Sequence, residues 1–300
     1  MRRKIIAGLL SSYVLFAHAA GHQHIAKFTQ VNGIDGSSRT TSPKLGSAIA
    51  LIYDEQTQQP LYAKNIDSVT PIASITKLMT AMVILDAHLP LDEPIAITAQ
   101  DRDHYKGTRS RMRNGMTLPR GDMMQLALMA SENTAAAALA RTFPGGTPVM
   151  LALMNAKARE LGMDSTRFDD PTGLHSSNVS TAQDLVKMVL AAQRYEDIQR
   201  YTTSHSHIVK VTTRQSLRFN NTNPLVRNGS WEIGLSKTGY ISEAGRCLVM
   251  QAKISNRPVV IVLLDSWGKH TRVGDANRIK RWIEGPDERA IRQVRHVRHS

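Results

Sequence analysis

Segments with strand character lie near both ends of this chain, and segments with helix character lie between them. The strand-like apolar runs cover residues 47–53, 61–64, 208–212, 231–240, 247–254 and 259–264. Helical patterns cover residues 74–88, 121–141, 148–161 and 181–193, and an amphipathic segment over 272–283 follows the last strand. This order predicts an α/β fold of the α+β kind, an antiparallel sheet flanked by helices with an inserted all-helical region.

The chain is long enough to bury a large core in one or two domains. It has 300 residues, of which 41% are hydrophobic. Cys247 is the only cysteine, so no intramolecular disulfide can form and stability must come from the core. Apolar residues follow Cys247 directly, which indicates a buried thiol on a strand.

The stretch PIASITKLMTAMVI, residues 71–84, places Ser74 and Lys77 inside an apolar helical pattern. Residues i and i+3 lie on one face of a helix, so the hydroxyl and the amine can touch. A helix start with a serine cap and a solvated lysine has the same spacing. Ser266 and Lys269 also have it and need no chemistry. The pair therefore indicates a catalytic site only if other motifs support it.

Two further motifs follow in the order expected of one enzyme class. Ser131-Glu132-Asn133 lies between two helical segments, and Lys237-Thr238-Gly239 lies on a predicted strand. An S-x-N triplet alone is weak, since residues 176–178 also match it. The combination of S-x-x-K, S-x-N and K-T-G is typical of penicillin-binding proteins and serine β-lactamases.

At this point the chain resembles a known family. The stretches PIASITKLMTAMVILDA, LALMASENTAAAALA, FDDPTGLHSSNVSTAQDL and GLSKTGY are similar to those of low-molecular-mass penicillin-binding proteins, the serine D-alanyl-D-alanine peptidases of bacterial cell walls. The resemblance covers about residues 47–282 and is nearest to the periplasmic endopeptidase subgroup. It implies a β-lactamase/transpeptidase-like fold and a penicillin-binding peptidase domain over residues 45–284.

The candidate catalytic residues are Ser74, Lys77 and Ser131. An unassisted serine hydroxyl is a poor nucleophile and needs an adjacent base. Lys77 can be that base only when neutral, and both partial burial and the nearby cation Lys237 would lower its pKa. Ser131 would then relay the proton to the leaving amine.

The candidate substrate-binding residues surround these three. Asn133 would bind the substrate backbone and hold Lys77, and Thr238, with Lys237 as a second candidate, would hold the substrate carboxylate. Gly239 lets the substrate lie along the strand edge. By family resemblance, the backbone N–H of Tyr240 would join that of Ser74 in an oxyanion hole.

Arg272 has two interpretations, a carboxylate-binding arginine as the resemblance implies, or a surface charge at a helix start. Asp169 and Asp170 are predicted to form a turn. Their loop lacks the glutamate-x-x-x-asparagine pattern of the commonest serine β-lactamases. We therefore expect slow release of penicillin, which makes the protein a target of the antibiotic and not a resistance enzyme.

Only residues 241–300 follow the K-T-G motif, and strands and one helix occupy most of them. Family carboxypeptidases usually continue into an all-β domain and an amphipathic membrane helix. We therefore predict an endopeptidase that hydrolyses D-Ala–diaminopimelate cross-links of peptidoglycan, with β-lactam antibiotics as covalent inhibitors. A D-Ala-D-Ala carboxypeptidase, a serine β-lactamase and a non-catalytic wall-binding module remain as alternatives.

The N-terminus has the pattern of a secretory signal peptide. Basic residues 2–4 precede an apolar run over 5–16 and the cleavage pattern Ala17-His18-Ala19. We expect a signal peptide over residues 1–19, a linker over 20–44, and a periplasmic protein. We expect no metal or other cofactor, because no zinc-type ligand spacing is present.

The formal net charge is +13, and a basic tail over residues 285–300 carries an arginine at every third position from 289 to 298. An exported protein is not expected to bind nucleic acid. The tail is either a solvated segment or a patch that keeps the protein near an anionic envelope surface.

Overall fold

The computed structural model describes residues 42–211 and 215–297, with side chains up to residue 285. The predicted signal peptide and most of the predicted linker lie outside these residues.

A five-stranded antiparallel sheet is the centre of the molecule, in the order β2-β1-β11-β10-β9. The strands are β1 (Ser47–Asp54), β2 (Gln59–Lys64), β9 (Glu232–Ile241), β10 (Gly245–Ile254) and β11 (Arg257–Ser266). The first and last strands of the chain pair directly, with Ile52 opposite Ile261. The predicted antiparallel sheet built from both ends of the chain is confirmed, and β9 lies at its edge.

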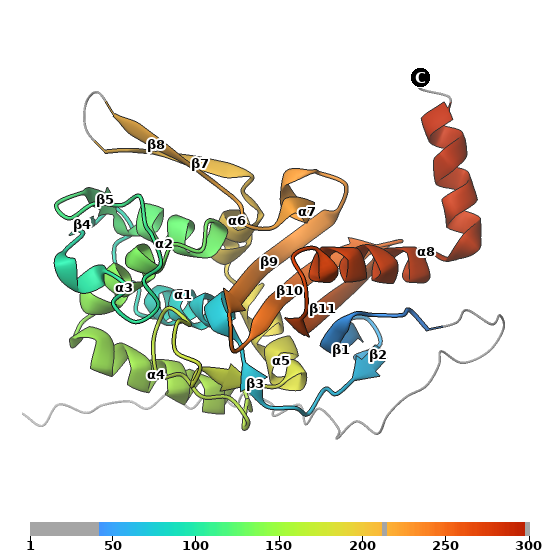
Figure 1. Ribbon diagram of the computed structural model, residues 1–300, viewed down its shortest axis with the longest axis horizontal. Helices are drawn as coiled ribbons and strands as arrows, with labels where there is room; N and C mark the ends of the chain where they lie inside the picture. Colours follow the sequence, from blue (N-terminus) through green and yellow to red (C-terminus); the bar gives the residue numbers. More distant parts are fainter. Residues whose placement is uncertain (1–41, 212–214, 298–300) are drawn as a thin grey trace, which may run out of the picture.

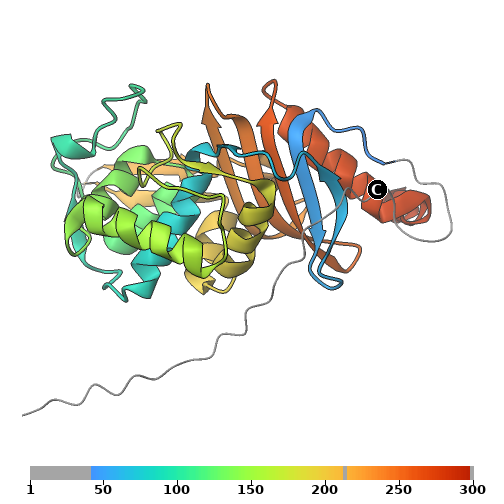
Figure 2. The ribbon, with the colours of Figure 1, turned by 90° about the horizontal axis from the view of Figure 1, so that it is seen from below.

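Helices cover both faces of this sheet (Figures 1 and 2). The helical region consists of α1 (Lys77–Asp86), α2 (Arg120–Met129), α3 (Asn133–Arg141), α4 (Gly146–Glu160), α5 (Ala182–Ala192) and α6 (Glu196–Thr203). Within it, α1 contacts each of the other five helices. Its residues are buried from Lys77 to Ile84, as expected of a helix that is apolar on nearly all sides.

The sheet separates two hydrophobic clusters. The larger one lies between the sheet and the helical region and includes Leu51, Val249 and Val262. The smaller one lies under α8 (Thr271–Val297) and includes Ile52 and Ile261. Successive side chains of a strand point to opposite faces, so a sheet covered on both sides needs apolar residues at nearly every position. This explains the continuous apolar runs in the sequence.

The last helix differs from the prediction. A helix was expected over 272–283 and a tail from 285, and the backbone does break at Gly285, where φ is 66° and ψ is 178°. Helical geometry then resumes and reaches Val297, so the described part of the tail is helical. Within the described residues, no helix combines the length and the apolar character needed to cross a membrane.

Several short elements were not predicted. They are the strand pairs β3 (Thr70–Pro71) with β6 (Val179–Ser180) and β4 (Pro94–Ala96) with β5 (Thr117–Pro119), the strand β8 (Ser216–Asn220) that pairs with β7 (Ser206–Lys210), the helices α6 and α7 (Pro224–Arg227), and the 3₁₀ turns η1 (Ala73–Thr76) and η2 (Ala99–Asp101). The segment predicted as a strand over 208–212 therefore belongs to a separate hairpin and not to the main sheet.

Candidate active site

Ser74 lies in the 3₁₀ turn η1, immediately before the central helix α1. The preceding residue, Ala73, has a φ of 48°, which non-glycine residues rarely adopt. Ser74 is half-buried, whereas Ala73 and Ile75 on either side are fully buried. The hydroxyl of Ser74 is therefore held at the edge of the core by a turn that has little freedom to move.

Lys77 is 1% exposed, and its amine has three hydrogen-bond partners. Its Nζ lies 2.7 Å from Ser74 Oγ, 2.7 Å from Asn133 Oδ1 and 2.6 Å from the carbonyl oxygen of Thr172. The amide and carbonyl oxygens can only accept. A neutral amine can donate its two N–H groups to them and turn its lone pair to the Ser74 hydroxyl. The arrangement thus fits both the charged and the neutral form of Lys77.

Burial lowers the pKa of Lys77 from 10.5 to about 7, although the charges of Asp170 and Glu132 oppose this. The pKa of Lys237 is also lowered well below its ordinary value, first by burial and then by the charges of Lys77 and Arg272. Burial, and not the second cation, is therefore the main cause for Lys77, which corrects the weight that the sequence interpretation gave to Lys237. Repulsion between two amines is mutual, so a proton on either one disfavours a proton on the other.

A second serine–lysine pair lies beside the first. Lys237 Nζ on β9 donates to Ser131 Oγ at 2.8 Å and to the Thr238 carbonyl oxygen at 2.9 Å. Ser131 lies between α2 and α3 and has a φ of 60°, a second strained residue in the site. Asn133 begins α3 and accepts from Lys77, so the S-x-N segment links the two pairs.

Two glycines allow the backbone around Ser74 to be closely packed. A Cβ on Gly239 would lie 2.9 Å from the Ile72 carbonyl oxygen and 3.2 Å from the Ser74 nitrogen. A Cβ on Gly173, where φ is +82°, would lie 1.9 Å from the Ala73 carbonyl oxygen. Gly239 therefore has a role in packing β9 against η1. Gly173 was not predicted as a site residue.

Asp170 organises the loop that supplies Thr172. Its carboxylate accepts from the backbone N–H groups of Thr172, Gly173 and His175. Asp169 forms an ion pair with Arg167. The predicted role in a turn is confirmed for Asp170, and the loop presents the Thr172 carbonyl to Lys77.

The far end of the site is formed by β9 and the start of α8. The hydroxyls of Thr238 and Thr222 lie 2.7 Å apart, and Thr222 was not predicted. Arg272 is half-buried and donates from Nη1 to the carbonyl oxygens of Gly239 at 2.8 Å and Cys247 at 3.0 Å. The interpretation of Arg272 as a surface charge is therefore wrong. Tyr240 is 56% exposed and follows the K-T-G motif directly.

A loop without regular structure, residues 102–116, reaches both sides of the site. Its Thr108 Oγ1 accepts from Asn133 Nδ2 at 3.0 Å, and Lys106 forms an ion pair with Glu243 in the turn after β9. The ring of Tyr105 stacks on that of His175 with 4.5 Å between centroids. No sequence pattern indicated these contacts, because each joins segments far apart in the chain.

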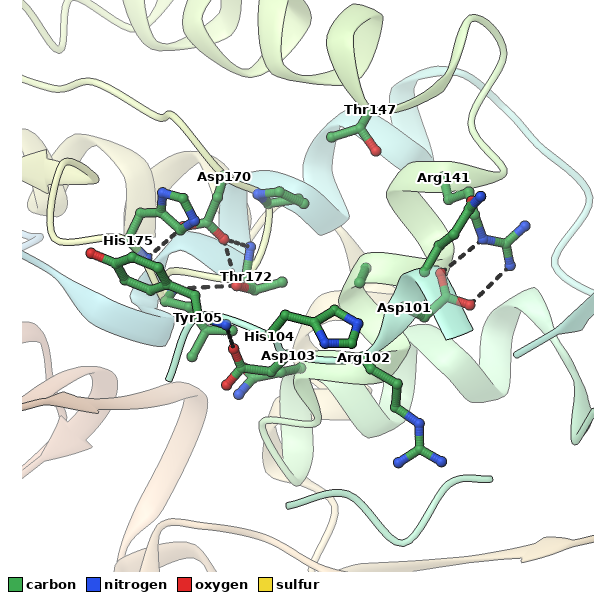
Figure 3. A pocket seen from close by; sticks show the side chains of 15 residues that line it. Asp101, Arg102, Asp103, His104, Tyr105, Arg141, Thr147, Asp170, Thr172 and His175 are labelled. Carbon is green, nitrogen blue, oxygen red and sulfur yellow. Dashed lines mark hydrogen bonds and ion pairs between the residues drawn. The ribbon is translucent and has the colours of Figure 1, made fainter. Parts of the chain in front are cut away.

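A pocket of about 390 Å³ adjoins the site between this loop, α3 and the loop around Asp170 (Figure 3). Its lining includes Asn133 and Thr172, which both accept from Lys77. Arg141 and Asp101 form an ion pair in its wall. Among the described residues, no group of three or more His, Cys, Asp or Glu side chains is placed to hold a metal ion. The arrangement offers a nucleophile, a base and a cavity beside them.

Comparisons with known proteins agree with this geometry. The family model of peptidase S11, D-alanyl-D-alanine carboxypeptidase, matches residues 37–268. The chain is 47% identical over 249 residues to the D-alanyl-D-alanine endopeptidase of Pseudomonas aeruginosa, covering 83% of this chain and 80% of that one. It is 43% identical over 282 residues to the D-alanyl-D-alanine endopeptidase of Escherichia coli, covering 94% and 89%.

Solved structures have the same fold. The Streptomyces K15 DD-transpeptidase superposes with a TM-score of 0.75 at 26% identity, covering 81% of this chain and 98% of that one. A D-alanyl-D-alanine carboxypeptidase from Mycobacterium tuberculosis gives a TM-score of 0.72 at 27% identity, covering 80% and 91%. The predicted penicillin-binding fold is thereby confirmed. The chain belongs to the D-alanyl-D-alanine carboxypeptidase family of serine peptidases, peptidase S11.

Proposed function

We propose that this enzyme is a D-alanyl-D-alanine endopeptidase that hydrolyses D-Ala–diaminopimelate cross-links of peptidoglycan through an acyl-enzyme. The observation that carries the proposal is the 2.7 Å contact between Ser74 Oγ and Lys77 Nζ, together with the pKa of about 7 that burial gives the amine. The endopeptidase names of the two relatives above support the choice of bond.

The first step forms the acyl-enzyme. The lone pair of neutral Lys77 takes the Ser74 hydroxyl proton while Ser74 Oγ bonds to the carbonyl carbon of D-Ala. Asn133 Oδ1 and the Thr172 carbonyl oxygen accept from the two N–H groups of neutral Lys77 and so orient its lone pair. The backbone N–H groups of Ser74 and Tyr240 donate to the oxyanion. Loss of one such donor costs about 100- to 1000-fold in rate.

The second step releases the amine and then the acid. The proton on Lys77 passes through the Ser131 hydroxyl to the leaving nitrogen as the C–N bond breaks. Lys237, at 2.8 Å from Ser131 Oγ, keeps that hydroxyl in place. Lys77 next takes a proton from water, the resulting hydroxide attacks the ester, and Ser74 Oγ leaves and recovers its proton.

The substrate binds as an added strand at the outer edge of β9, the last strand of the sheet order. Asn133 binds its backbone, and Thr238 with Lys237 and Arg272 hold the carboxylate of the leaving residue. Gly239 has no side chain to obstruct this edge. The hydroxyl contact between Thr222 and Thr238 supports the role of Thr238, because it orients the Thr238 side chain.

β-Lactams acylate Ser74 by the same step and leave slowly. The Asp170 carboxylate accepts hydrogen bonds from three backbone N–H groups, and Asp169 forms an ion pair with Arg167. Neither carboxylate is therefore available to activate a water for deacylation. Nitrocefin distinguishes this enzyme from a β-lactamase. We expect one acylation per protein molecule, whereas many rapid turnovers would establish the β-lactamase alternative.

The proposed location is the periplasm, after removal of residues 1–19, with the linker over 20–44, the peptidase domain over 45–284 and the basic tail over 285–300. The tail would associate peripherally with an anionic envelope surface. N-terminal sequencing of the exported protein tests the cleavage site. Retention of the tail-truncated protein by the envelope at low salt would contradict a role of the tail in association.

Digestion of purified cross-linked muropeptide dimers tests the proposed bond. The enzyme is expected to convert dimers to monomers, and Ser74→Ala is expected to leave dimers intact. Release of terminal D-Ala alone, with dimers persisting, would show that the enzyme is a carboxypeptidase.

A further inference from the structure

Arg246 lies beside the K-T-G motif but is not part of it. It is the second residue of β10, opposite Tyr240 of β9, and its guanidinium lies 4.5 Å from the centroid of the Tyr240 ring. Such stacking orients the guanidinium while its N–H groups stay available to a ligand. Both residues are at least partly exposed, so this cation is presented to solvent directly after the active-site strand segment.

Arg246 and Arg272 lie in the same part of the molecule, and neither has an ion-pair partner among the described side chains. Arg272 Nη1 donates to the carbonyl oxygen of Cys247, the residue next to Arg246. Burial, and after it the charge of Arg246, lowers the pKa of Arg272. Among the side chains that the structure describes, neither forms an ion pair with a carboxylate. Glu243 in the β9–β10 turn is paired with Lys106, and Asp265 of β11, whose carboxylate lies beside Gly245, forms no ion pair with either arginine. Two adjacent arginines without an acidic partner favour an anionic ligand.

The position of Arg246 relates it to the leaving group. Thr238 and Tyr240 are two residues apart on β9 and so lie on the same face, with Arg246 opposite Tyr240. In the proposed function, Thr238 and Arg272 hold the carboxylate of the leaving residue. Whatever continues from that residue passes toward Tyr240 and Arg246. A free D-Ala leaving group has only a methyl side chain, whereas a cross-linked residue continues into a peptide with further carboxylates.

We propose that Arg246, held on the ring of Tyr240, binds a second carboxylate on the leaving peptide and thereby favours cross-linked peptides over peptides that end in D-Ala-D-Ala. This inference rests on the proposed function, since it names what selects the bond at the same site. Arg246 is a specificity residue in this account and takes no part in proton transfer.

The test compares Arg246→Gln with the wild-type enzyme on three substrates. They are a cross-linked dimer, the same dimer synthesised with amides in place of the distal carboxylates of its leaving strand, and a pentapeptide ending in D-Ala-D-Ala. We expect kcat/KM for the first dimer to fall about 10- to 100-fold, the range for a hydrogen bond to a charged group. The pentapeptide reaction should change less than about twofold, and the amidated dimer should react equally slowly with both enzymes.

Arg246→Lys should have a kcat/KM for the dimer between those of Arg246→Gln and the wild type. Lysine keeps the positive charge but cannot donate two parallel hydrogen bonds to a carboxylate as a guanidinium does. Lys253→Gln is the matched control, because Lys253 is a cation at the other end of β10. It should leave kcat/KM for all three substrates unchanged. Acylation by benzylpenicillin at the wild-type rate shows that each variant has folded. Equal losses on dimer and pentapeptide would overturn the role of Arg246, as would fast cleavage of the amidated dimer by the wild-type enzyme. A wild-type enzyme that cleaves no dimer would instead overturn the proposed function itself.

Discussion

The amine of Lys77 is the group whose protonation should control acylation. Its pKa of about 7 means that the neutral base form increases as the pH rises through 7. The rate of acylation by benzylpenicillin should therefore rise with pH and level off above about 8. At pH 6 it should be about one tenth of the plateau, because only the neutral fraction reacts. Stopped reactions between pH 5 and 9 measure this, and a rate that still rises toward pH 10 would contradict it.

The carboxylate of Glu132 opposes the pKa lowering of Lys77 by attracting its proton. Glu132→Gln removes that charge while keeping an acceptor for Ser110 Oγ, which lies 2.8 Å away. The pKa of Lys77 should fall further, so the acid limb of the acylation profile should move to lower pH. Glu243→Gln is the control, since Glu243 is exposed and paired with Lys106. A shift of the limb to higher pH in Glu132→Gln would contradict the electrostatic account.

The residues of the three motifs could be predicted from sequence, because each motif keeps its spacing within one short segment. The partners Thr172, Thr108 and Thr222 could not. Thr172 contributes a backbone carbonyl, which any residue has, and the other two reach the site from distant loops. The role of burial in the pKa of Lys77 also depends on the packing of α1 at the centre of the helical region.

At the scale of elements, the turn η1 is held between β9 and the loop around Asp170. Gly173→Ala should disturb this arrangement, because its Cβ would lie 1.9 Å from a backbone oxygen of η1. We expect a loss of about 3 kcal/mol from the free energy of unfolding, combining overpacking with a strained φ. Acylation should also be lost or greatly slowed, since η1 carries Ser74.

Gly115→Ala is the matched control, because its φ of +83° equals that of Gly173 within a degree and no atom lies within 4 Å of the added Cβ. It should cost only the conformational strain, about 1 kcal/mol. Urea unfolding and penicillin acylation measure both variants. Equal effects of the two substitutions would show that the close approach of Gly173 to η1 is unimportant.

Most long elements followed from apolar periodicity, whereas the helix α6 and most short elements did not. The main strands and helices have continuous or periodic apolar patterns that local sequence reveals. The strand β8 and the strands of the pairs β3–β6 and β4–β5 are only two to five residues long and depend on what packs around them. The sequence predicted a sheet that combines strands from both ends of the chain. It did not predict the order of those strands, in which the first and the last lie side by side.

At the scale of the whole molecule, a buried network joins both ends of the domain. Asp275 of α8 accepts from Ser47 N at 2.8 Å and from Ser47 Oγ at 2.6 Å, and Ser47 Oγ lies 2.7 Å from Ser266 Oγ. These residues belong to the first strand, the last strand and the last helix. The network therefore connects the two ends of the chain that form the sheet.

Asp275→Asn should lower the free energy of unfolding by about 2 kcal/mol, because a buried donor loses its charged acceptor. The hydrogen bonds that Asp275 accepts lower its pKa, so its stabilising effect is present above the unfolded value near 4 and is lost as the pH falls through the folded value. The exposed Asp92→Asn is the control and should change little. Denaturant unfolding at pH 7 and pH 3 measures the difference. A cost that persists undiminished at pH 3 would contradict the role of the charge.

The central claim is that Ser74, activated by Lys77, is the nucleophile of the whole enzyme. Peptide mapping of the benzylpenicillin adduct tests it most directly, with fragmentation to assign the modified residue. We predict a single penicilloyl group on Ser74, within the tryptic peptide NIDSVTPIASITK of residues 65–77. A penicilloyl group on any other side chain, or an unmodified protein after prolonged incubation, would contradict the account.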